Sequence, residues 1–179
     1  MTSQVAPSHA SAIRRLALVT DRDLQALAGL LIDCVDGGAS VSFMAPLTPA
    51  KALDFWRGVG EGAARGERVL LVAEDSVGMV GTVQLILAQP ENQPHRADVA
   101  KMLVHRRARR QGLGAALMQA AEQAAREAGK TLLVLDTASD EAERLYARQG
   151  WHRVGVIPGY ALLPTGEPCD TAYFYKVLA

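Results

Sequence analysis

The sequence predicts a single domain of mixed structure, in the α/β (α+β) class. Apolar, β-like runs alternate along the chain with amphipathic helical patterns, as expected for helices packed on a sheet. A length of 179 residues fits one domain, and 49% hydrophobic against 21% charged residues excludes a disordered chain. We therefore expect residues 13–179 to fold together and residues 1–12 to form an N-terminal tail.

The first third of the chain is predicted to form a strand, a helix, a loop and a second helix. Residues 13–20 are the expected strand, and Asp21 or Asp23 can cap a leucine-rich helix that runs to two adjacent glycines. Residues 39–47 are expected as a loop. Pro49 suits the first turn of the second helix, because its missing N–H has no helical partner there.

The middle of the chain is predicted to form three strands. Residues 68–73 and 79–87 are apolar on either side of a short turn segment, which predicts a β-hairpin. After a polar loop, residues 97–104 form another expected strand.

The remaining elements follow the same alternation. An amphipathic helix ends at Gly129, a buried strand covers residues 132–135, and Ser139 or Asp140 can cap a last helix. The final strands are expected at 151–156 and 172–177, with the Pro- and Gly-rich residues 158–170 as a loop between them.

Charge and cysteine content narrow the possible partners. Nineteen Lys and Arg residues balance nineteen Asp and Glu residues, which argues against a general nucleic-acid binder. Cys34 and Cys169 are isolated, the histidines are scattered, and no stretch approaches the roughly 20 apolar residues of a membrane span. We expect a cytoplasmic protein with no metal, no nucleic-acid partner and no membrane partner.

The turn that follows the strand at 97–104 carries the most information. It contains glycines at Gly112 and Gly114 and opens a helix, whose first N–H groups have no helical partners. Such a turn can bind a phosphate group, or it can be a solvated basic turn whose glycines serve chain geometry alone. Four arginines surround it: Arg106, Arg107, Arg109 and Arg110.

These residues resemble a known family. Arg109-x-x-Gly112-x-Gly114 is similar to the R/Q-x-x-G-x-G/A signature of the GNAT family of N-acetyltransferases. The preceding Val99-x-x-Met102-x-Val104 resembles the fourth strand of that fold. A later motif also matches, Ser139-x-x-Ala142-x-x-x-Tyr146 followed by Gly150-Trp151, with Ser139 where the family commonly has Asn.

The resemblance implies the GNAT fold, which is a mixed, mostly antiparallel sheet of about seven strands with about four helices. It also implies acetyl-CoA as acyl donor and direct attack by an amine in a ternary complex. The pyrophosphate would lie on the amides of residues 109–114, with Arg110 or Arg107 available to the phosphates. The implied cofactor-binding residues are Met102, Leu103, Val104, Arg109, Arg110, Gln111, Gly112, Leu113, Gly114, Ala115 and Thr137.

Three residues are candidates for catalysis. An alkyl ammonium with a pKa of about 10.4 must lose a proton before it attacks, and Asp98 or Asp136, each near a strand end, can accept that proton. Tyr146 is the candidate acid for the departing thiolate, because of its place in the matching motif. Each has a structural alternative: a solvated strand residue for Asp98, a turn carboxylate for Asp136 and an aromatic anchor for Tyr146.

Two further segments resemble the tabtoxin-resistance type of acetyltransferase, which acetylates a small amino-acid toxin. They are Gly37-Gly38-Ala39-Ser40-Val41-x-Phe43-Met44 and Pro158-Gly159-Tyr160, and they imply Ser40, Phe43 and Tyr160 as substrate-binding residues. The expected acceptor is a primary amine of a small amino-acid-like, antibiotic or toxin molecule. A protein N-terminus or lysine, or a non-catalytic acyl-CoA sensor, stays as an alternative. The family also suggests a homodimer.

Overall fold

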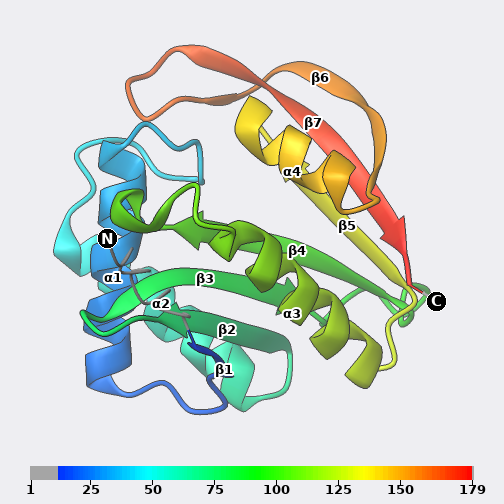
Figure 1. Cartoon of the computed structure of the whole chain (residues 1–179), viewed down its shortest axis with the longest axis horizontal. Helices are drawn as coiled ribbons and strands as arrows, with labels where there is room; N and C mark the ends of the chain where they lie inside the picture. Colours follow the sequence, from blue (N-terminus) through cyan, green and yellow to red (C-terminus); the bar gives the residue numbers. More distant parts are fainter. Residues whose placement is uncertain (1–11, 179) are drawn as a thin grey trace, which may run out of the picture.

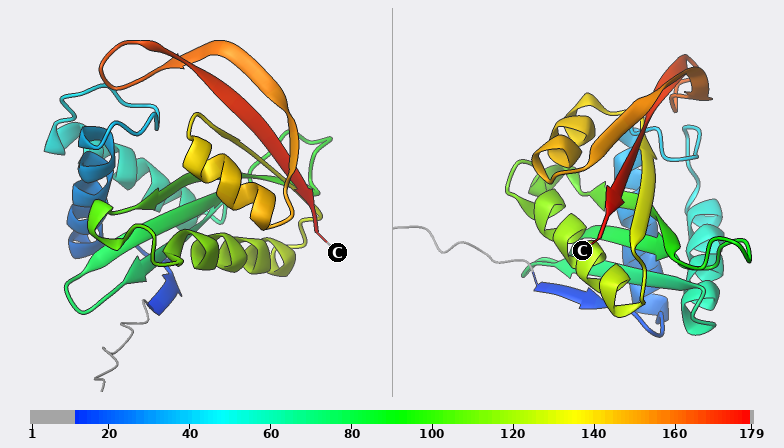
Figure 2. Two further views of the ribbon diagram at one scale, coloured as in Figure 1. Left: turned by 45° about the horizontal axis from the view of Figure 1, so that its top comes forward. Right: turned by 90° about the vertical axis from the view of Figure 1, so that its right-hand side faces the viewer.

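The structure, a computed structural model, describes residues 12–178. Over these residues one mixed sheet of seven strands carries α1 and α2 on one face and α3 and α4 on the other (Figures 1 and 2). The predicted fold class is confirmed. The strands are β1 (Ala12–Arg15), β2 (Arg68–Glu74), β3 (Met79–Ile86), β4 (Arg96–Val104), β5 (Leu132–Thr137), β6 (His152–Leu162) and β7 (Pro168–Val177). The helices are α1 (Asp21–Asp36), α2 (Pro49–Ala64), α3 (Leu113–Glu127), α4 (Asp140–Arg148) and a short 3₁₀ turn, η1 (Arg106–Ala108).

The sheet is a wedge that opens between two of its strands. The strand order is β1-β2-β3-β4-β5-β7-β6, and every neighbouring pair is antiparallel except β4 and β5. These two parallel strands pair at only three positions, from Arg96 with Leu132 to Asp98 with Val134. Beyond that point they diverge, as Figure 1 shows.

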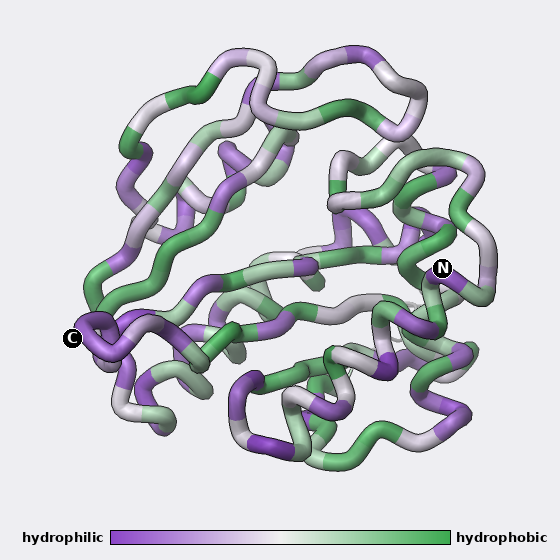
Figure 3. Tube along the Cα trace, turned by 180° about the vertical axis from the view of Figure 1, so that it is seen from behind, coloured by the Kyte–Doolittle hydropathy of each residue, from purple (hydrophilic) through white to green (hydrophobic). Residues whose placement is uncertain are grey.

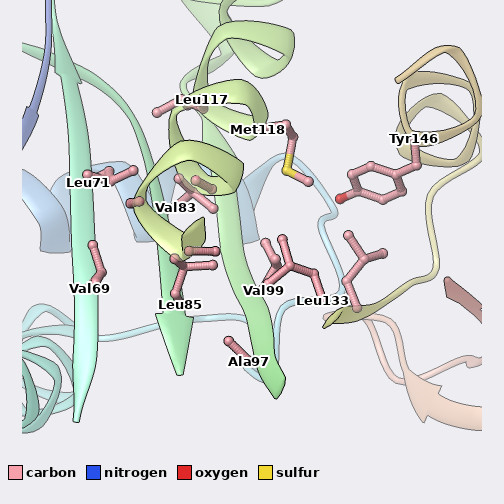
Figure 4. Packing of buried hydrophobic residues seen from close by; sticks show 14 of the residues in the cluster. Val69, Leu71, Val83, Leu85, Ala97, Val99, Leu117, Met118, Leu133 and Tyr146 are labelled. Atoms are coloured by element: carbon pink, nitrogen blue, oxygen red, sulfur yellow. The ribbon is translucent and has the colours of Figure 1, made fainter. Parts of the chain in front are cut away.

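Two hydrophobic cores hold the helices to the sheet. On one face, α3 packs on β2, β3 and β4, with Leu117 on the side of Val83 and Met118 between Val99 and Tyr146 (Figure 4). A side chain at Gly81 would place its Cβ 2.8 Å from a methyl carbon of Leu117, so this glycine lets α3 approach β3 closely. On the other face, α1 and α2 enclose a second core around the fully buried Trp56.

A β-bulge changes which side chains of β4 face α3. Ala97 and Val99 belong to the α3 core, and then Met102 and Val104 pack against it, so the alternation shifts by one residue. The shift coincides with an irregular register against β3 and with a positive φ of 50° at Lys101. Lys101, in the middle of the strand, is therefore the residue whose backbone conformation is strained.

The first strand is shorter than the sequence predicts. It ends at Arg15, and Thr20 caps α1 in place of the expected Asp21 or Asp23. The Thr20 hydroxyl accepts a bond from the Asp23 amide, while the Asp23 carboxylate accepts one from the Thr20 amide. This reciprocal cap typically stabilises a helix by about 1 kcal/mol. Of the expected tail, residues 1–11 lie outside the described residues, and Ala12 already belongs to β1.

The end of the chain differs most from expectation. The segment 158–170, predicted as a loop, mostly continues the two last strands, so that β6 and β7 form a long hairpin. A register irregularity between Ile157 and Ala161 accommodates Pro158 and its following glycine. Proline is tolerated there because β6 is the outermost strand.

No helix within residues 12–178 combines the length and the apolar character needed to cross a bilayer.

Candidate active site

The wedge between β4 and β5 leads into one cavity of about 1090 Å³. Its walls come from six parts of the chain. They are the end of α1 with the following loop (37–44), β4 (99–104), the turn into α3 (108–110 and 112–115), the end of β5 with α4, the end of β6 with the next residue (160–163), and Thr171 on β7. The cavity therefore joins the basic turn to the candidate catalytic residues.

The exposed edge of β4 can hold an extended ligand. From Val99 onwards β4 has no strand partner on its β5 side among the described residues. Backbone N–H and C=O groups need hydrogen-bond partners, so this edge can pair with a ligand of amide character. The predicted residues Met102, Leu103 and Val104 all line the cavity beside this edge.

The turn between η1 and α3 presents free amides to the cavity. Gly112, at the N-cap of α3, has a φ of 81°, which explains the need for glycine, and Arg110 also has a positive φ of 60°. No side chain caps α3, and the first helical bond runs from the Ala116 amide to the Gly112 carbonyl. The preceding amides, with the helix dipole behind them, suit a phosphate group.

The four arginines of the turn do not act together. Arg106 binds Asp33 through its side chain at 2.8 Å, and Arg107 forms an ion pair with Asp75. Neither lines the cavity, so the structure does not support the expectation that Arg107 is available to phosphates. Arg109 and Arg110 do line it.

These two cavity arginines have different roles. The Nε atom of Arg109 donates to the Val104 carbonyl at 3.3 Å, which ties the turn to the end of β4. Arg110 forms no hydrogen bond or ion pair within residues 12–178 and has its charge free for a ligand. Gln111 lies outside the cavity, and its side-chain amide donates to the Arg107 carbonyl.

Asp136 lies where β5 leaves β4. Its Oδ2 atom accepts a 3.0 Å hydrogen bond from the hydroxyl of Thr171, which is 3% exposed. Both residues line the cavity, and so does the neighbouring Thr137. The carboxylate is thus oriented toward the opening of the wedge by a buried neighbour on β7.

Tyr146 reaches the cavity from α4. Its ring packs against Phe174, with centroids 5.6 Å apart, and its hydroxyl points toward β4 (Figure 4). That hydroxyl forms no hydrogen bond with the described part of the chain. Burial, and secondarily the negative charge of Asp136, raise the pKa of Tyr146 well above its usual value. The residue keeps its proton at physiological pH and can donate it.

Asp98 is separated from this group. It lies before the wedge opens, outside the cavity lining, and binds Arg96 at 2.7 Å and the side chain of Gln89 at 3.1 Å. Of the two candidate bases, the structure therefore brings Asp136, and not Asp98, into the cavity with Tyr146.

The loop after α1 and the last hairpin meet over the cavity. The Ser40 hydroxyl donates to the Leu162 carbonyl at 3.1 Å, and the Ala45 amide donates to the Pro164 carbonyl at 3.0 Å. Phe43 lines the cavity and packs edge-on against Phe55. We call the two hydrogen bonds, from Ser40 to Leu162 and from Ala45 to Pro164, the loop–hairpin contact. They cover the side of the cavity that faces α1 and α2.

Tyr160, the third predicted substrate residue, also lines the cavity. It accepts a 2.9 Å hydrogen bond from the hydroxyl of Tyr173. This bond, with lesser contributions from burial and from nearby negative charges, raises the pKa of Tyr173 to about 12. The Tyr173 phenol therefore keeps its proton at physiological pH.

Three charged residues of the cavity were not expected from the sequence. Lys101 lines the cavity from the bulge in β4, and Glu141 and Arg148 line it from α4. A lysine within the otherwise apolar stretch 99–104 was a signal for the first. Nothing in the sequence distinguishes Arg148 from Arg144, the other arginine of its helix, or Glu141 from the other acidic residues there.

Residues 66–153 match the family described as "Acetyltransferase (GNAT) domain". This segment includes β4, the basic turn, Asp136 and Tyr146.

Solved structures share the fold over nearly the whole chain. A ribosomal-protein-alanine N-acetyltransferase from Brucella melitensis is 24% identical, with a TM-score of 0.78 over 93% of this chain and 99% of that chain. An N-acetyltransferase from Staphylococcus aureus is 20% identical, with a TM-score of 0.77 over 94% and 99%. A phosphinothricin acetyltransferase from Sinorhizobium meliloti, in complex with acetyl-CoA, is 17% identical, with a TM-score of 0.77 over 94% and 89%. The matched segment carries motifs that line one cavity of this shared fold, so residues 66–153 are recognised as an acetyltransferase domain of the GNAT family.

Proposed function

We propose that this protein transfers the acetyl group of acetyl-CoA to a primary amine of a small, amino-acid-like molecule. One observation carries the proposal. A single cavity joins the free amides at the start of α3, the unpaired edge of β4 and the carboxylate of Asp136.

The donor-binding residues follow from the cavity walls. The amides from Arg110 to Ala115 and the free guanidinium of Arg110 suit the pyrophosphate, whereas the edge from Val99 to Val104 suits the amides of the pantetheine arm. The Sinorhizobium meliloti neighbour was solved with acetyl-CoA, which supports the same donor here. Acetyl-CoA supplies the activated thioester.

Asp136 and Tyr146 act on the protons of the transfer. The acceptor enters as an ammonium ion and gives one proton to Asp136, directly or through a water molecule. The free amine nitrogen then forms a bond to the thioester carbonyl carbon as the carbon–sulfur bond breaks. The sulfur leaves with the bonding electron pair and takes a proton from Tyr146, while the nitrogen loses its second proton to solvent and Asp136 then releases the first one. The products are an N-acetyl amide, CoA thiol and one released proton, and Tyr146 regains its proton from solvent.

The loop–hairpin contact favours a small acceptor. A peptide would need an open groove on the face that Ser40, Leu162 and Ala45 help to close. The name of the Sinorhizobium meliloti neighbour specifies phosphinothricin, an amino-acid-like acceptor. Detoxification of an amino-acid antibiotic or toxin is the corresponding biological role.

A protein N-terminus is the second candidate acceptor, and one observation favours it. The Brucella melitensis neighbour, with a TM-score of 0.78, is named for acetylating a ribosomal-protein alanine. A non-catalytic acyl-CoA sensor is less favoured, because such a protein has no need for Asp136 and Tyr146 beside the donor site.

A homodimer in the cytoplasm completes the proposal. β6 is the edge strand of the sheet and runs along the rim of the trace in Figure 3. Almost every one of its residues is exposed, including Val154 at 68%, which favours a second copy as its cover. Cys34 and Cys169 are both free, in keeping with a reducing compartment.

The decisive experiment measures CoA release from acetyl-CoA with three classes of acceptor. The first class is free amino acids, including phosphinothricin. The second is peptides with a free N-terminus, and the third is peptides whose amine is a lysine side chain. We expect turnover with the first class. Turnover confined to peptides would overturn the small-acceptor proposal. Calorimetry that detects no acetyl-CoA binding would overturn the donor assignment as well.

A further inference from the structure

Lys101 is a charged side chain in the wall of the cavity that the transfer chemistry does not use. It lies at the bulge in β4, with a φ of 50° that L-amino acids rarely adopt. The bulge brings it into the cavity wall, in the middle of a strand whose other cavity residues are apolar. A costly backbone conformation at a charged residue is a reason to look for a role in the site.

The surroundings of the ammonium group hold it in place without neutralising it. Its Nζ atom donates to the Ser42 hydroxyl at 3.1 Å and lies 5.5 Å from the ring centroid of Phe55. Within residues 12–178, Nζ has no carboxylate at ion-pair distance. The contrast is Lys176, another half-buried lysine, whose Nζ lies 2.7 Å from a Glu122 carboxylate oxygen.

The surroundings of Lys101 disfavour the charged form of its side chain. Burial lowers the pKa of Lys101, and Arg68 adds to that effect, whereas the negative charge of Asp136 opposes it. Asp136 is therefore close enough to influence the ammonium group but too far away to pair with it. An anion between the two would relieve the cost of the unpaired charge.

The cavity thus presents a cation and an anion on the walls of its acceptor side. We propose that Lys101 binds an anionic group of the acceptor, such as a carboxylate, while Asp136 receives the ammonium group that becomes acetylated. The acceptor is then a zwitterion whose two charges lie a few bonds apart. This inference rests on the proposed acetyltransferase function and adds its specificity-determining residue.

The first test uses the wild-type protein with matched acceptors. CoA release is measured with a set of amino acids and with their primary amides, which keep the amine and the side chain but lose the carboxylate charge. We expect kcat/KM to be at least about tenfold higher for the acids, because a buried charge left unpaired penalises the amides. Equal rates for acids and amides would overturn the inference but leave the acetyltransferase function intact.

The second test uses Lys101→Met, which keeps the length of the side chain and removes its charge. We expect KM for the acid to rise at least about tenfold, kcat/KM for the amide to change little, and the preference for the acid to disappear. A merely structural lysine would lower both rates together and leave the preference unchanged. The matched control is Lys51→Met, since Lys51 lies 5.8 Å from the ring centroid of Phe43 but outside the cavity.

The two proposals fail in distinguishable ways. If no amine in the set is acetylated and calorimetry detects no acetyl-CoA binding, the proposed function is wrong. If amines are acetylated and the preference for the acid survives in Lys101→Met, the role of Lys101 is wrong. Melting temperatures of the variants show whether each one is folded at the assay temperature.

Discussion

The hydroxyl of Thr171 donates a 3.0 Å hydrogen bond to the Asp136 carboxylate from the neighbouring strand β7. Because Thr171 is buried, its hydroxyl holds one oxygen of the carboxylate in place, and both residues line the cavity. Asp136 is thereby both positioned and left with a free oxygen for a proton.

Replacement of Asp136 by Asn should lower kcat by about 10²- to 10⁴-fold, the usual contribution of a proton acceptor. The ratio of wild-type kcat to variant kcat should fall as pH rises toward the amine pKa of about 10.4, because more of the acceptor amine is then already deprotonated. Thr171→Val should have a smaller effect of the same kind. The measurement is kcat between pH 7 and about 10; a deficit independent of pH would contradict the role as base.

Tyr146→Phe should reduce kcat by roughly tenfold and leave the melting temperature unchanged. The loss is modest because alignment of amine and thioester supplies much of the rate. The fold is unaffected because the hydroxyl bonds no described residue, while the ring still packs on Phe174. Since the pKa of Tyr146 is raised, wild-type kcat should not fall through loss of this proton below pH 10. Tyr173→Phe, which loses its bond to Tyr160, is the comparison variant.

Arg110 and Arg106 allow a matched comparison within one turn. Arg110→Ala should raise KM for acetyl-CoA about tenfold, as expected for loss of a charge-assisted hydrogen bond. Arg106→Ala should leave that KM unchanged, because Arg106 binds Asp33 outside the cavity, and should have little effect on the free energy of unfolding, because this ion pair is exposed to solvent on the Arg106 side. Equal effects of both substitutions on KM would show that general positive charge, rather than the position of Arg110, attracts the donor.

We expect Glu122 to contribute to the free energy of unfolding. It accepts bonds from Lys176 Nζ at 2.7 and 2.8 Å and from the Trp151 indole at 3.1 Å, which joins α3 to the β7 side of the sheet. Glu122→Ala leaves a buried ammonium unpaired and should lower the free energy of unfolding by about 3–5 kcal/mol, measured by urea denaturation. Glu127→Ala, at an exposed site on the same helix, should stay within about 0.5 kcal/mol of wild type.

The outer strand should mediate self-association. We expect the wild-type protein to sediment as a dimer and Val154→Asp to sediment as a monomer, because a carboxylate on β6 cannot be buried against a second copy. Val77→Asp is the control, since Val77 is 80% exposed in the turn between β2 and β3. A monomeric wild type would exclude this interface.

Local sequence signals were sufficient to predict the glycine turn and the start of α3, which line the cavity. The glycine turn and the start of α3 depend on backbone requirements that act within a few residues, and the motif carries them. Asp136 could be expected in the cavity because it ends a strand.

The errors concern contacts between distant segments. The pairing of Arg107 with Asp75 and of Asp98 with Arg96 and Gln89 removes them from the site, and no local pattern indicates such pairs. Lys101 reaches the cavity only because a bulge shifts the register of β4 against β3. The β6–β7 hairpin was read as a loop because its proline and glycines are turn signals elsewhere, whereas an edge strand accepts them.

The loop–hairpin contact also constrains any redesign of this enzyme. A graft that replaces the loop alone would leave the carbonyls of Leu162 and Pro164 without the donors that Ser40 and Ala45 supply. The two segments must therefore be exchanged as a matched pair. The unit from β4 through α3 takes no part in these two bonds. It contacts the exchanged loop through the bond from Lys101 to the Ser42 hydroxyl, so a chimaera that keeps this unit must also keep an acceptor at position 42.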